Sequence, residues 1–578
     1  MRGVQESVPP VGTGIPGERR PGLPELTALQ LWLALLVSSL ALVAGGCSGG
    51  DEGESGTGAT TGEGGSEAVN QVITVNWGAE PSSLDPSLAG DVTSANILHN
   101  IMDPLVKLDE DLNPTPAAAE SFEVSEDGVT VTFVLRDDIR WTTGDRVTAA
   151  DFEYAWKRTV SPELDALNAY QFDGIVGAKD YHRCDPKHDD CDALARKVGV
   201  KAIDEKTLEV TLTSPQPWFV QQVAHHSFLA VHKATVDKFG DKWTEAANIV
   251  TNGPFKLANW EHNFTIDIVK DDTWRDADSV TLTRVNGRMI SDAITALRAF
   301  EAGKIDVLNG GLPPDAISRL KKTPAYEWYE GLGIYYYGVN VENIPDVKQR
   351  RAMALAIPRQ SIIDNISQKG ELPASGFTPQ GMPGFDTISP ESPFLPAAGD
   401  IEQAKQLMGE VANPKTEITL YLNDNPPNPN IAVAVQAAFE EIGIESTIKQ
   451  QEFQQYLETL GPPPNKDVDV YRLGWIGDYV DAINFLELWK CKSVFNHTNY
   501  CNHEYDALIE KARRTRDNDA RYELYAQAED ILFGENGDMP VLPIYFFTYV
   551  NLERESVKET FNLNLLDQVD LTKVVVKE

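Results

Sequence analysis

Asp478 lies in a strongly apolar and aromatic stretch, "YRLGWIGDYVDAINFLELW", which covers residues 471–489. An ionised carboxylate that is removed from water must be paired or become neutral. The sequence therefore predicts a positive partner for Asp478. That partner is either a Lys or Arg of the chain itself, in a structural salt bridge, or a group that comes from outside the chain.

Catalytic chemistry finds little support in the sequence. No G-x-S-x-G and no H-E-x-x-H occurs in the chain, so two common hydrolase motifs are absent. His225 and His226 are adjacent, and on a strand their side chains would point to opposite faces. We therefore expect a binding protein that is not an enzyme, with no catalytic residues and no cofactor.

The N-terminus indicates export. Arg19 and Arg20 precede the apolar run "LQLWLALLVSSLALVA" at residues 29–44, which is the order of a secretory signal. The run ends in "VAGGC", which resembles a bacterial lipobox, although Ala44 stands where Leu is usual. The resemblance implies that Cys47 is acylated and anchors the chain to the outer face of the membrane, and an uncleaved membrane anchor is the alternative.

Four further cysteines fall in two local pairs, in "CDPKHDDC" and "CKSVFNHTNYC". Outside the cell, an even number of cysteines in close pairs indicates disulfides. We predict one bond between Cys184 and Cys191 and another between Cys491 and Cys501.

A metal site is the alternative for the second pair, because His497 and His503 lie beside it. The spacing of Cys491, His497, Cys501 and His503 matches no standard zinc pattern. An oxidising environment also favours the disulfide. We therefore predict no metal.

Size and charge restrict the class of protein. The chain has 578 residues and 42% hydrophobic residues, so it is globular and large enough for two or more lobes. Its 50 Lys and Arg against 87 Asp and Glu give a net charge of -37. So acidic a surface repels nucleic acid, and we expect no nucleic-acid partner.

Local patterns predict the elements that position these residues. The turn "EDG" at 126–128 separates two β-rich runs and predicts a hairpin. Thr148 and Asp151 form a capping pattern for a helix in which Phe152 and Trp156 share a stripe. An amphipathic helix is also predicted from about residue 518 up to Gly534.

The stretch "PNPNIAVAVQAAFEEIGIESTIKQQEF", residues 427–453, predicts a helix to about Ile442, a stop at Gly443 and a strand. A strand is also predicted at 71–78. Strand and helix signals alternate along the chain, so we predict the α/β class.

Residues 117–158, "AAAESFEVSEDGVTVTFVLRDDIRWTTGDRVTAADFEYAWKR", resemble the signature region of the family 5 extracytoplasmic solute-binding proteins. The stretch at 239–260 resembles the oligopeptide-binding branch of that family, and 335–363 resembles the start of its second lobe. The resemblance extends from about residue 72 to the C-terminus. It implies a large, two-lobed periplasmic-binding-protein-like fold of type II, with an extra subdomain in the first lobe.

The resemblance also implies the partner of Asp478. "GWIGDY" is similar to the "GW-x-x-DY" segment of peptide-binding members, whose Asp holds the α-ammonium group of the bound peptide. Arg472 matches an Arg that serves the peptide's C-terminal carboxylate for some peptide lengths. A planar guanidinium suits this carboxylate, and bracing of the sheet edge is the alternative role for Arg472.

The remaining contacts implied by the family are mostly main chain. An extended peptide would pair like a strand with residues around Val92 and with the "LGW" segment, which contains Gly474 and Trp475. Three aromatic residues match family positions near the ligand and are equally compatible with core roles: Tyr170, Phe453 and Tyr545. Gly333 and Ile476 stand where some members carry a disulfide, which puts the local shape of the pocket in doubt.

The expected division of the chain follows the resemblance. The predicted segments are the signal peptide and lipobox (1–47), a disordered tether (48–70), lobe I (71–102), its extra subdomain (103–245), lobe I (246–331), lobe II (332–543) and the return to lobe I (544–578).

The function implied is capture of extended oligopeptides for an ABC importer, whose membrane permease is the partner; the alternative is the same fold with another solute, such as a dipeptide, a nickel complex, haem or an oligosaccharide. We expect a monomer.

Overall fold

The structure is a computed structural model that describes residues 69–578, except 110–111, 390–393, 426 and 462–463. The predicted signal segment, Cys47 and nearly all of the predicted tether lie outside the described residues. Residues 68–578 form a unit separate from residues 1–67, and everything below concerns that unit. In the described part of the chain, no helix combines the length and the hydrophobicity needed to cross a membrane.

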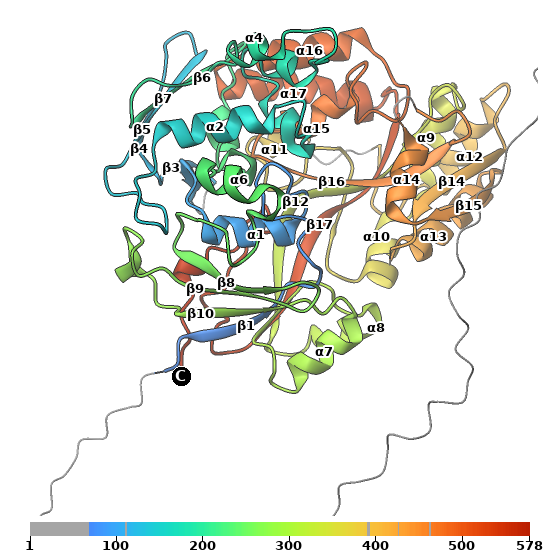
Figure 1. Cartoon of the computed structure of the whole chain (residues 1–578). Coiled ribbons are helices and arrows are strands. Elements are labelled where there is room, and N and C mark those ends of the chain that lie inside the picture. The colour runs from blue at the N-terminus through green and yellow to red at the C-terminus, as the bar shows by residue number, and fades with distance from the viewer. Residues whose placement is uncertain (1–68, 110–111, 390–393, 426, 462–463) are drawn as a thin grey trace, which may run out of the picture. The chain divides into compact units, whose positions relative to one another are not determined.

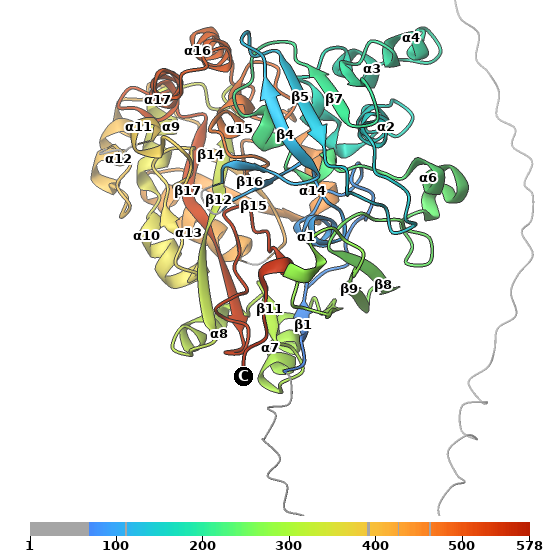
Figure 2. The same cartoon turned by 90° about the vertical axis from the view of Figure 1, so that its left-hand side faces the viewer.

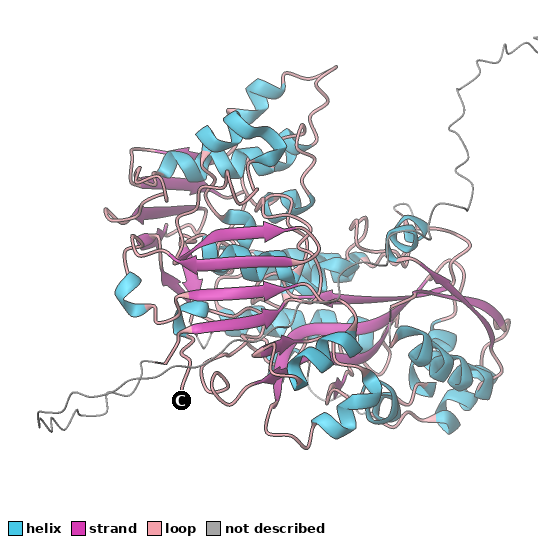
Figure 3. Ribbon diagram, turned by 60° about the horizontal axis from the view of Figure 1, so that its bottom comes forward, coloured by secondary structure: helices cyan, strands magenta, loops and turns pink. Residues whose placement is uncertain are grey.

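An 11-stranded mixed sheet organises the described residues (Figure 1; Figure 3, strands in magenta). Ten strands follow one another across it, and the short β13 (Leu372–Pro373) pairs with β17 off this path. In spatial order they are β15 (Glu445–Gln451), β14 (Glu417–Asn423), β16 (Val470–Ile476), β12 (Tyr326–Val339), β17 (Val541–Glu553), β11 (Val307–Asn309), β1 (Val72–Asn76), β10 (Arg284–Arg288), β9 (Thr265–Lys270) and β8 (Phe255–Glu261).

The two long strands β12 and β17 connect the two ends of this sheet (Figure 2). They pair with each other antiparallel, and their register shifts between Glu330 and Ile334 and again between Tyr335 and Tyr336. The C-terminal part of β12 pairs with β16 on one side and with the N-terminal part of β17 on the other. The C-terminal end of β17 pairs with β11. We expect the hinge at these two strands, because they cross from one set of elements to the other.

The buried cores follow the same division. One core cluster runs from Leu332 to Leu566 and takes only Leu112 and Trp218 from the earlier chain. A second cluster spans residues 73–307 and 557–574, and a third, smaller one includes residues 296–320 with Val550 and Leu552. The fold class is confirmed as α/β with two lobes, and the exact segment boundaries stay a prediction.

The predicted hairpin is present in a separate antiparallel sheet. Its strand order is β4 (Ala119–Val124), β5 (Thr130–Leu135), β7 (Thr207–Thr211) and β6 (Val200–Ala202). Gly128 closes the turn between β4 and β5 with a φ of +74°, a conformation that glycine adopts without strain. A further pair of strands, β2 (Val106–Leu108) and β3 (Pro114–Pro116), precedes this sheet.

The predicted helices form where their signals lie. In α2 (Ala149–Thr159) the carboxylate of Asp151 accepts a 2.8 Å hydrogen bond from the backbone N–H of Thr148. Helix α13 (Asn428–Glu441) is followed by Gly443 at a φ of +80° and then by β15, which lies parallel to β14. Helix α17 (Asn518–Phe533) ends at Gly534.

The other helices cover the sheets on both sides of the hinge strands (Figure 1). Before β12 they are α1 (Val92–Ile101), α3 (Ala178–His182), α4 (Cys191–Ala195), α5 (Phe219–Gln222), α6 (Lys233–Phe239), α7 (Ala293–Glu301) and α8 (Pro314–Leu320). After β12 they are α9 (Val347–Ala356), α10 (Arg359–Ile362), α11 (Phe385–Ile388), α12 (Ile401–Gly409), α14 (Phe453–Leu460), α15 (Ile483–Leu486) and α16 (His503–Arg513).

Candidate functional site

Strand β16 presents an open edge. It pairs with β12 along its whole length, from Val470 to Ile476. Its other neighbour, β14, pairs with it only at Val470 and Tyr471. Among the described residues, no strand therefore lies beside the segment 473–476 on that side, and this segment contains the predicted contacts Gly474 and Trp475. Free backbone groups on a strand edge are a template for an added strand.

Asp478 follows β16 and is half-buried. Its Oδ2 accepts hydrogen bonds from the hydroxyl of Tyr170 at 2.9 Å and from the side-chain amide of Asn484 at 3.2 Å. Burial raises the pKa of Asp478, and these hydrogen bonds act in the opposite direction. Two neutral hydrogen-bond donors do not balance the negative charge of the carboxylate.

The first alternative for Asp478, an internal salt bridge, is not realised. Within the described part of the chain, no Lys, Arg or His lies within salt-bridge distance of it. The two other carboxylates of the segment 471–489 do have charged partners. Asp481 pairs with Arg521 at 3.1 Å, and Glu487 pairs with Arg513. Asp478 is therefore the carboxylate of this segment that lacks a positively charged partner among the described residues.

Asn484, which lies in α15, was not anticipated from the sequence. Its Oδ1 accepts a hydrogen bond from the indole N–H of Trp475 and one from the backbone N–H of Asp478, both at 3.1 Å. The same side chain donates to the Asp478 carboxylate, so it fixes both residues. Its position six residues after Asp478 is the only signal in the sequence, and it is not specific.

Tyr170 and Gln171, from the earlier part of the chain, lie next to Asp478. Tyr170 lies in the 3-10 helix η1 (Leu167–Phe172) and packs against Phe495 at a ring-centroid distance of 5.5 Å. Phe495 also packs against Trp475 at 5.0 Å. Gln171 supports the arrangement by donating a 3.0 Å hydrogen bond to the Tyr170 hydroxyl. The surroundings of Asp478 thus combine residues that are 308 positions apart.

A second contact joins the same two parts of the chain. Trp218, which precedes α5, lies nearly parallel to Tyr479, with ring centroids 6.5 Å apart and an interplanar angle of 9°. The guanidinium of Arg513 lies 5.7 Å from the Trp218 ring centroid. Trp218 is 2% exposed and belongs to the core cluster of the later chain. It therefore ties residues 103–245 to the segment that carries Asp478.

Arg472 lies on β16 in an aromatic environment. Its guanidinium is 4.1 Å from the ring centroid of Tyr335 and donates a 3.3 Å hydrogen bond to Oδ1 of Asn423. Burial acts to lower the pKa of Arg472, but nearby tyrosines, led by Tyr335 and Tyr545, raise it overall. Among the described residues it forms no salt bridge with a carboxylate, and its Nε has no hydrogen-bond partner.

Three other predicted contacts lie in different settings. Tyr545, on β17, is 3% exposed and stacks on Tyr335 at 4.8 Å, so it belongs to the core around Arg472. Phe453, the first residue of α14, is 45% exposed. Val92 is the first residue of α1. Asp91 caps the helix at this point, and pairing of a ligand with the backbone around Val92 stays a prediction. Val92 lines a cavity of about 180 Å³.

Gly333 and Ile476 are directly opposite each other on β12 and β16. A Cβ on Gly333 would lie 2.3 Å from Cδ2 of Phe547, and a Cβ on Gly474 would lie 2.9 Å from Cζ of the same ring. Phe547 thus occupies the space beside both glycines. A larger residue at position 333 would require this ring to move.

Both predicted disulfides are present, between Cys184 and Cys191 and between Cys491 and Cys501. The loop that the second bond closes contains Phe495, which packs on Trp475 and Tyr170.

The expected divergence of His225 and His226 depended on a strand, which the structure does not have at this point. These residues lie at the start of the 3-10 helix η2 (His226–Phe228), where the chain is not a strand, and their ring centroids are 4.0 Å apart. Burial lowers the pKa of His226 to about 4, so both rings pack as neutral groups.

Comparison with known proteins places the chain. A sequence model of the bacterial extracellular solute-binding proteins, family 5, middle region, matches residues 113–496. The dipeptide-binding protein DppE of Bacillus subtilis is 34% identical over 547 residues, which cover 92% of this chain and 96% of DppE. The oligopeptide-binding protein OppA of the same organism is 32% identical, with 91% and 96% covered.

Solved structures show the same architecture. The crystal structure of Haemophilus influenzae OppA in complex with the peptide RPPGFSPFR superposes with a TM-score of 0.74 at 28% identity. The match covers 88% of this chain and 99% of that protein. The region matched by the family model, residues 113–496, includes both Asp478 and Tyr170.

Proposed function

This chain belongs to the bacterial extracellular solute-binding proteins of family 5, and we propose that it captures extended oligopeptides between two lobes. In this proposal it is the substrate-binding component of an ABC importer and delivers the peptide to a membrane permease. The match to OppA of Bacillus subtilis, which is named for oligopeptide binding, covers 96% of that protein. Binding and release by hinge motion require no catalytic group.

The observation that carries the proposal is the isolated carboxylate of Asp478. It is half-buried, its pKa is raised by burial, and its described partners are the neutral Tyr170 and Asn484. A peptide's α-ammonium would supply the missing positive charge. An ion pair in a partly dehydrated site is stabilising only when both groups are closely paired, so a free N-terminus would be recognised strongly.

Two further features support an extended peptide. The segment 473–476 of β16 has an open edge among the described residues, to which a peptide backbone can add as a strand. Arg472, on the same strand, forms no salt bridge within the described residues and keeps its positive charge. We propose that it attracts the peptide's C-terminal carboxylate. Main-chain pairing would give affinity with little dependence on peptide side chains.

A dipeptide is the second candidate ligand, because a relative that covers 92% of this chain is named for dipeptide binding. The two candidates share the recognition of the ammonium group by Asp478. They differ in how much of the open β16 edge the ligand occupies. Native mass spectrometry of the purified chain would identify a retained ligand and its length.

For the location, we propose an extracytoplasmic chain that is anchored at the outer face of the membrane through a lipid on Cys47. The supporting observations are the apolar run at 29–44, the "VAGGC" segment and the extracellular character of the family. Metabolic labelling with a fatty acid should mark the wild-type chain, whereas Cys47→Ser should be unlabelled. Labelling that persists in Cys47→Ser would contradict the anchor.

Isothermal titration calorimetry with tri- to pentapeptides tests the peptide proposal. Free peptides should bind the wild type about 100-fold more tightly than their N-acetylated forms, since truncating one side of a buried charge pair costs roughly 2–5 kcal/mol. Asp478→Ala should bind both forms weakly. The control is Asp467→Asn, which removes an exposed carboxylate just before β16 and should change nothing. Equal wild-type affinity for both forms would defeat the assignment.

A further inference from the structure

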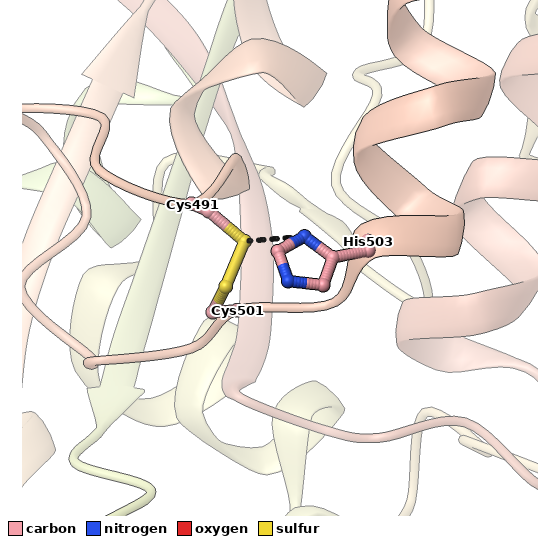
Figure 4. Close-up of side chains that lie close together, drawn as sticks. All are labelled: Cys491, Cys501 and His503. Atoms are coloured by element: carbon pink, nitrogen blue, oxygen red, sulfur yellow. Dashed lines mark hydrogen bonds between the residues drawn. A yellow bond between two sulfur atoms is a disulfide. The ribbon is translucent and has the colours of Figure 1, made fainter.

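Three side chains of types that can bind a metal ion lie close together at the start of α16 (Figure 4). Cys491 and Cys501 are joined by their disulfide, and Nδ1 of His503 lies 3.9 Å from Sγ of Cys491. The two sulfurs and one His503 ring nitrogen all lie within 4.8 Å of one another. Cys491 is half-buried and the other two residues are exposed, so both a reductant and an ion can reach them.

The geometry is close to that of a zinc site. With Zn–S bonds of about 2.3 Å and Zn–N bonds of about 2.0 Å in a tetrahedron, sulfur and nitrogen lie about 3.6 Å apart and two sulfurs about 3.8 Å apart. The imidazole of His503 is therefore already at nearly the required distance from Cys491. The change still needed is cleavage of the disulfide, which lets the two sulfurs separate.

The start of α16 favours the thiolate form of the two cysteines. His503 is the first residue of α16, and the partial positive charge of a helix N-terminus stabilises thiolates. Asp506, one turn further along, accepts a 3.1 Å hydrogen bond from the backbone N–H of Cys491. Asp506 is not among the three side chains that lie within 4.8 Å of one another, so a water molecule would complete four ligands.

We propose that the Cys491–Cys501 disulfide and a zinc-type divalent cation are alternative occupants of this cluster, with Cys491, Cys501 and His503 as the protein ligands. Two equivalents of a small thiol reduce the disulfide: they supply two electrons and two protons and leave as their own disulfide. Zn²⁺ then displaces the two cysteine protons to solvent. In either state the loop that carries Phe495 stays closed.

The other disulfide provides a matched control. Cys184 and Cys191 also close a short loop, but no His, Asp or Glu of the described residues forms a comparable three-ligand group with them. His188, inside that loop, is paired with Asp185 at 2.6 Å. Reduction of this bond should therefore create no metal site of similar affinity.

The test is a zinc titration of the full chain, oxidised or reduced with a phosphine, against a chromogenic chelator. The Cys184→Ser/Cys191→Ser variant isolates the second bond. The reduced form of this variant should bind one Zn²⁺ at least about 100-fold more tightly than its oxidised form. Adding His503→Ala should weaken the binding of zinc to the reduced form about tenfold or more. Cobalt in place of zinc should give the thiolate charge-transfer band and the visible spectrum of a tetrahedral ion.

Each other result counts against the proposal. These are equal zinc affinity of the oxidised and reduced chains, no effect of His503→Ala, an octahedral cobalt spectrum, or comparable binding by the reduced Cys491→Ser/Cys501→Ser variant. Near-ultraviolet circular dichroism checks the fold. Loss of that signal on reduction would also overturn the proposal, because the site requires His503 to stay at the start of α16.

Discussion

Arg472 and Asp478 are six residues apart, yet their surroundings are built differently. Arg472 is held by Tyr335, Tyr545 and Asn423, all from residues 332–553. Asp478 is held by Asn484 of its own segment and by Tyr170 from the early part of the chain. The positive site is thus complete within the later part of the chain, where Tyr335 and Tyr545 share one core cluster, whereas the negative site also needs a residue from the early part.

This difference separates two roles. A preformed site keeps its geometry when the lobes move, but a shared site depends on their closure. In the proposed function, binding of the ligand's ammonium group would therefore depend on closure of the lobes. The ligand's C-terminal carboxylate could bind at Arg472 before the lobes close. Changes of pH and of single residues should therefore act differently on the two sites.

The largest effect should be a dependence of peptide affinity on pH. Burial raises the pKa of Asp478 above the ordinary value for an aspartate, and only the ionised form attracts an ammonium group. Affinity for free peptides should therefore be constant between this pKa and the pH of about 8 at which the peptide's own α-amino group deprotonates. It should fall as the pH decreases through the pKa of Asp478, by up to about 100-fold. Calorimetric titrations between neutral pH and mild acid measure the change.

The baseline for that experiment is Asp478→Asn, which should bind weakly at every pH. It is needed because burial also raises the pKa of Glu529 and Glu553 to about 7, and their titration could disturb the fold. A wild-type profile that is flat, or one that matches the profile of Asp478→Asn, would contradict the role of Asp478.

Arg472→Gln should cost about tenfold in affinity for peptides with a free C-terminus, or about 1.4 kcal/mol. The loss is smaller than at Asp478 because the surrounding tyrosines and Asn423 remain to hydrogen-bond a carboxylate. C-terminally amidated peptides should bind the wild type and Arg472→Gln equally. A variant that loses as much affinity for amidated as for free peptides would assign Arg472 to bracing the sheet.

Tyr170→Phe should shift the pH profile upward and weaken binding a few-fold at neutral pH. The Tyr170 hydroxyl provides the strongest of the hydrogen bonds that lower the pKa of Asp478, and a hydrogen bond to a charged group contributes about 1.5–3 kcal/mol. The matched control is Tyr545→Phe, which removes a hydroxyl beside Arg472. Tyr545→Phe should leave the midpoint of the pH profile of peptide affinity unchanged. An equal shift of that midpoint in both variants would contradict the difference between the two sites.

The smallest effect concerns stability without ligand. The folded-state pKa of Asp478 is raised, so its ionised form destabilises the fold at pH values above that pKa, and this cost disappears as the carboxyl becomes protonated. Asp478→Asn should therefore raise the free energy of unfolding at neutral pH by about 1 kcal/mol. Arg472→Gln should lower it, because the contact with Tyr335 is lost. Thermal unfolding of ligand-free chains that gave the same sign for both would refute this.

Local signals in the sequence were sufficient for much of the fold. The EDG turn, the Thr148–Asp151 cap and the stop at Gly443 all formed as predicted, because each depends on residues within a few positions of one another. The expected divergence of His225 and His226 depended on a strand, and the chain begins a 3-10 helix there. The ligand contact at Val92 depended on the family resemblance and stays a prediction.

By itself, the sequence determined that Asp478 needs a positive partner, that the cysteines pair locally and that strands alternate with helices. Only the tertiary structure decided that no cation of the described chain meets Asp478, and that Tyr170, Phe495 and Trp218 close around its segment. The physical reason is range. Caps, turns and short disulfide loops act between near neighbours, but the environment of a buried charge is set by side chains hundreds of residues away, which no local pattern encodes.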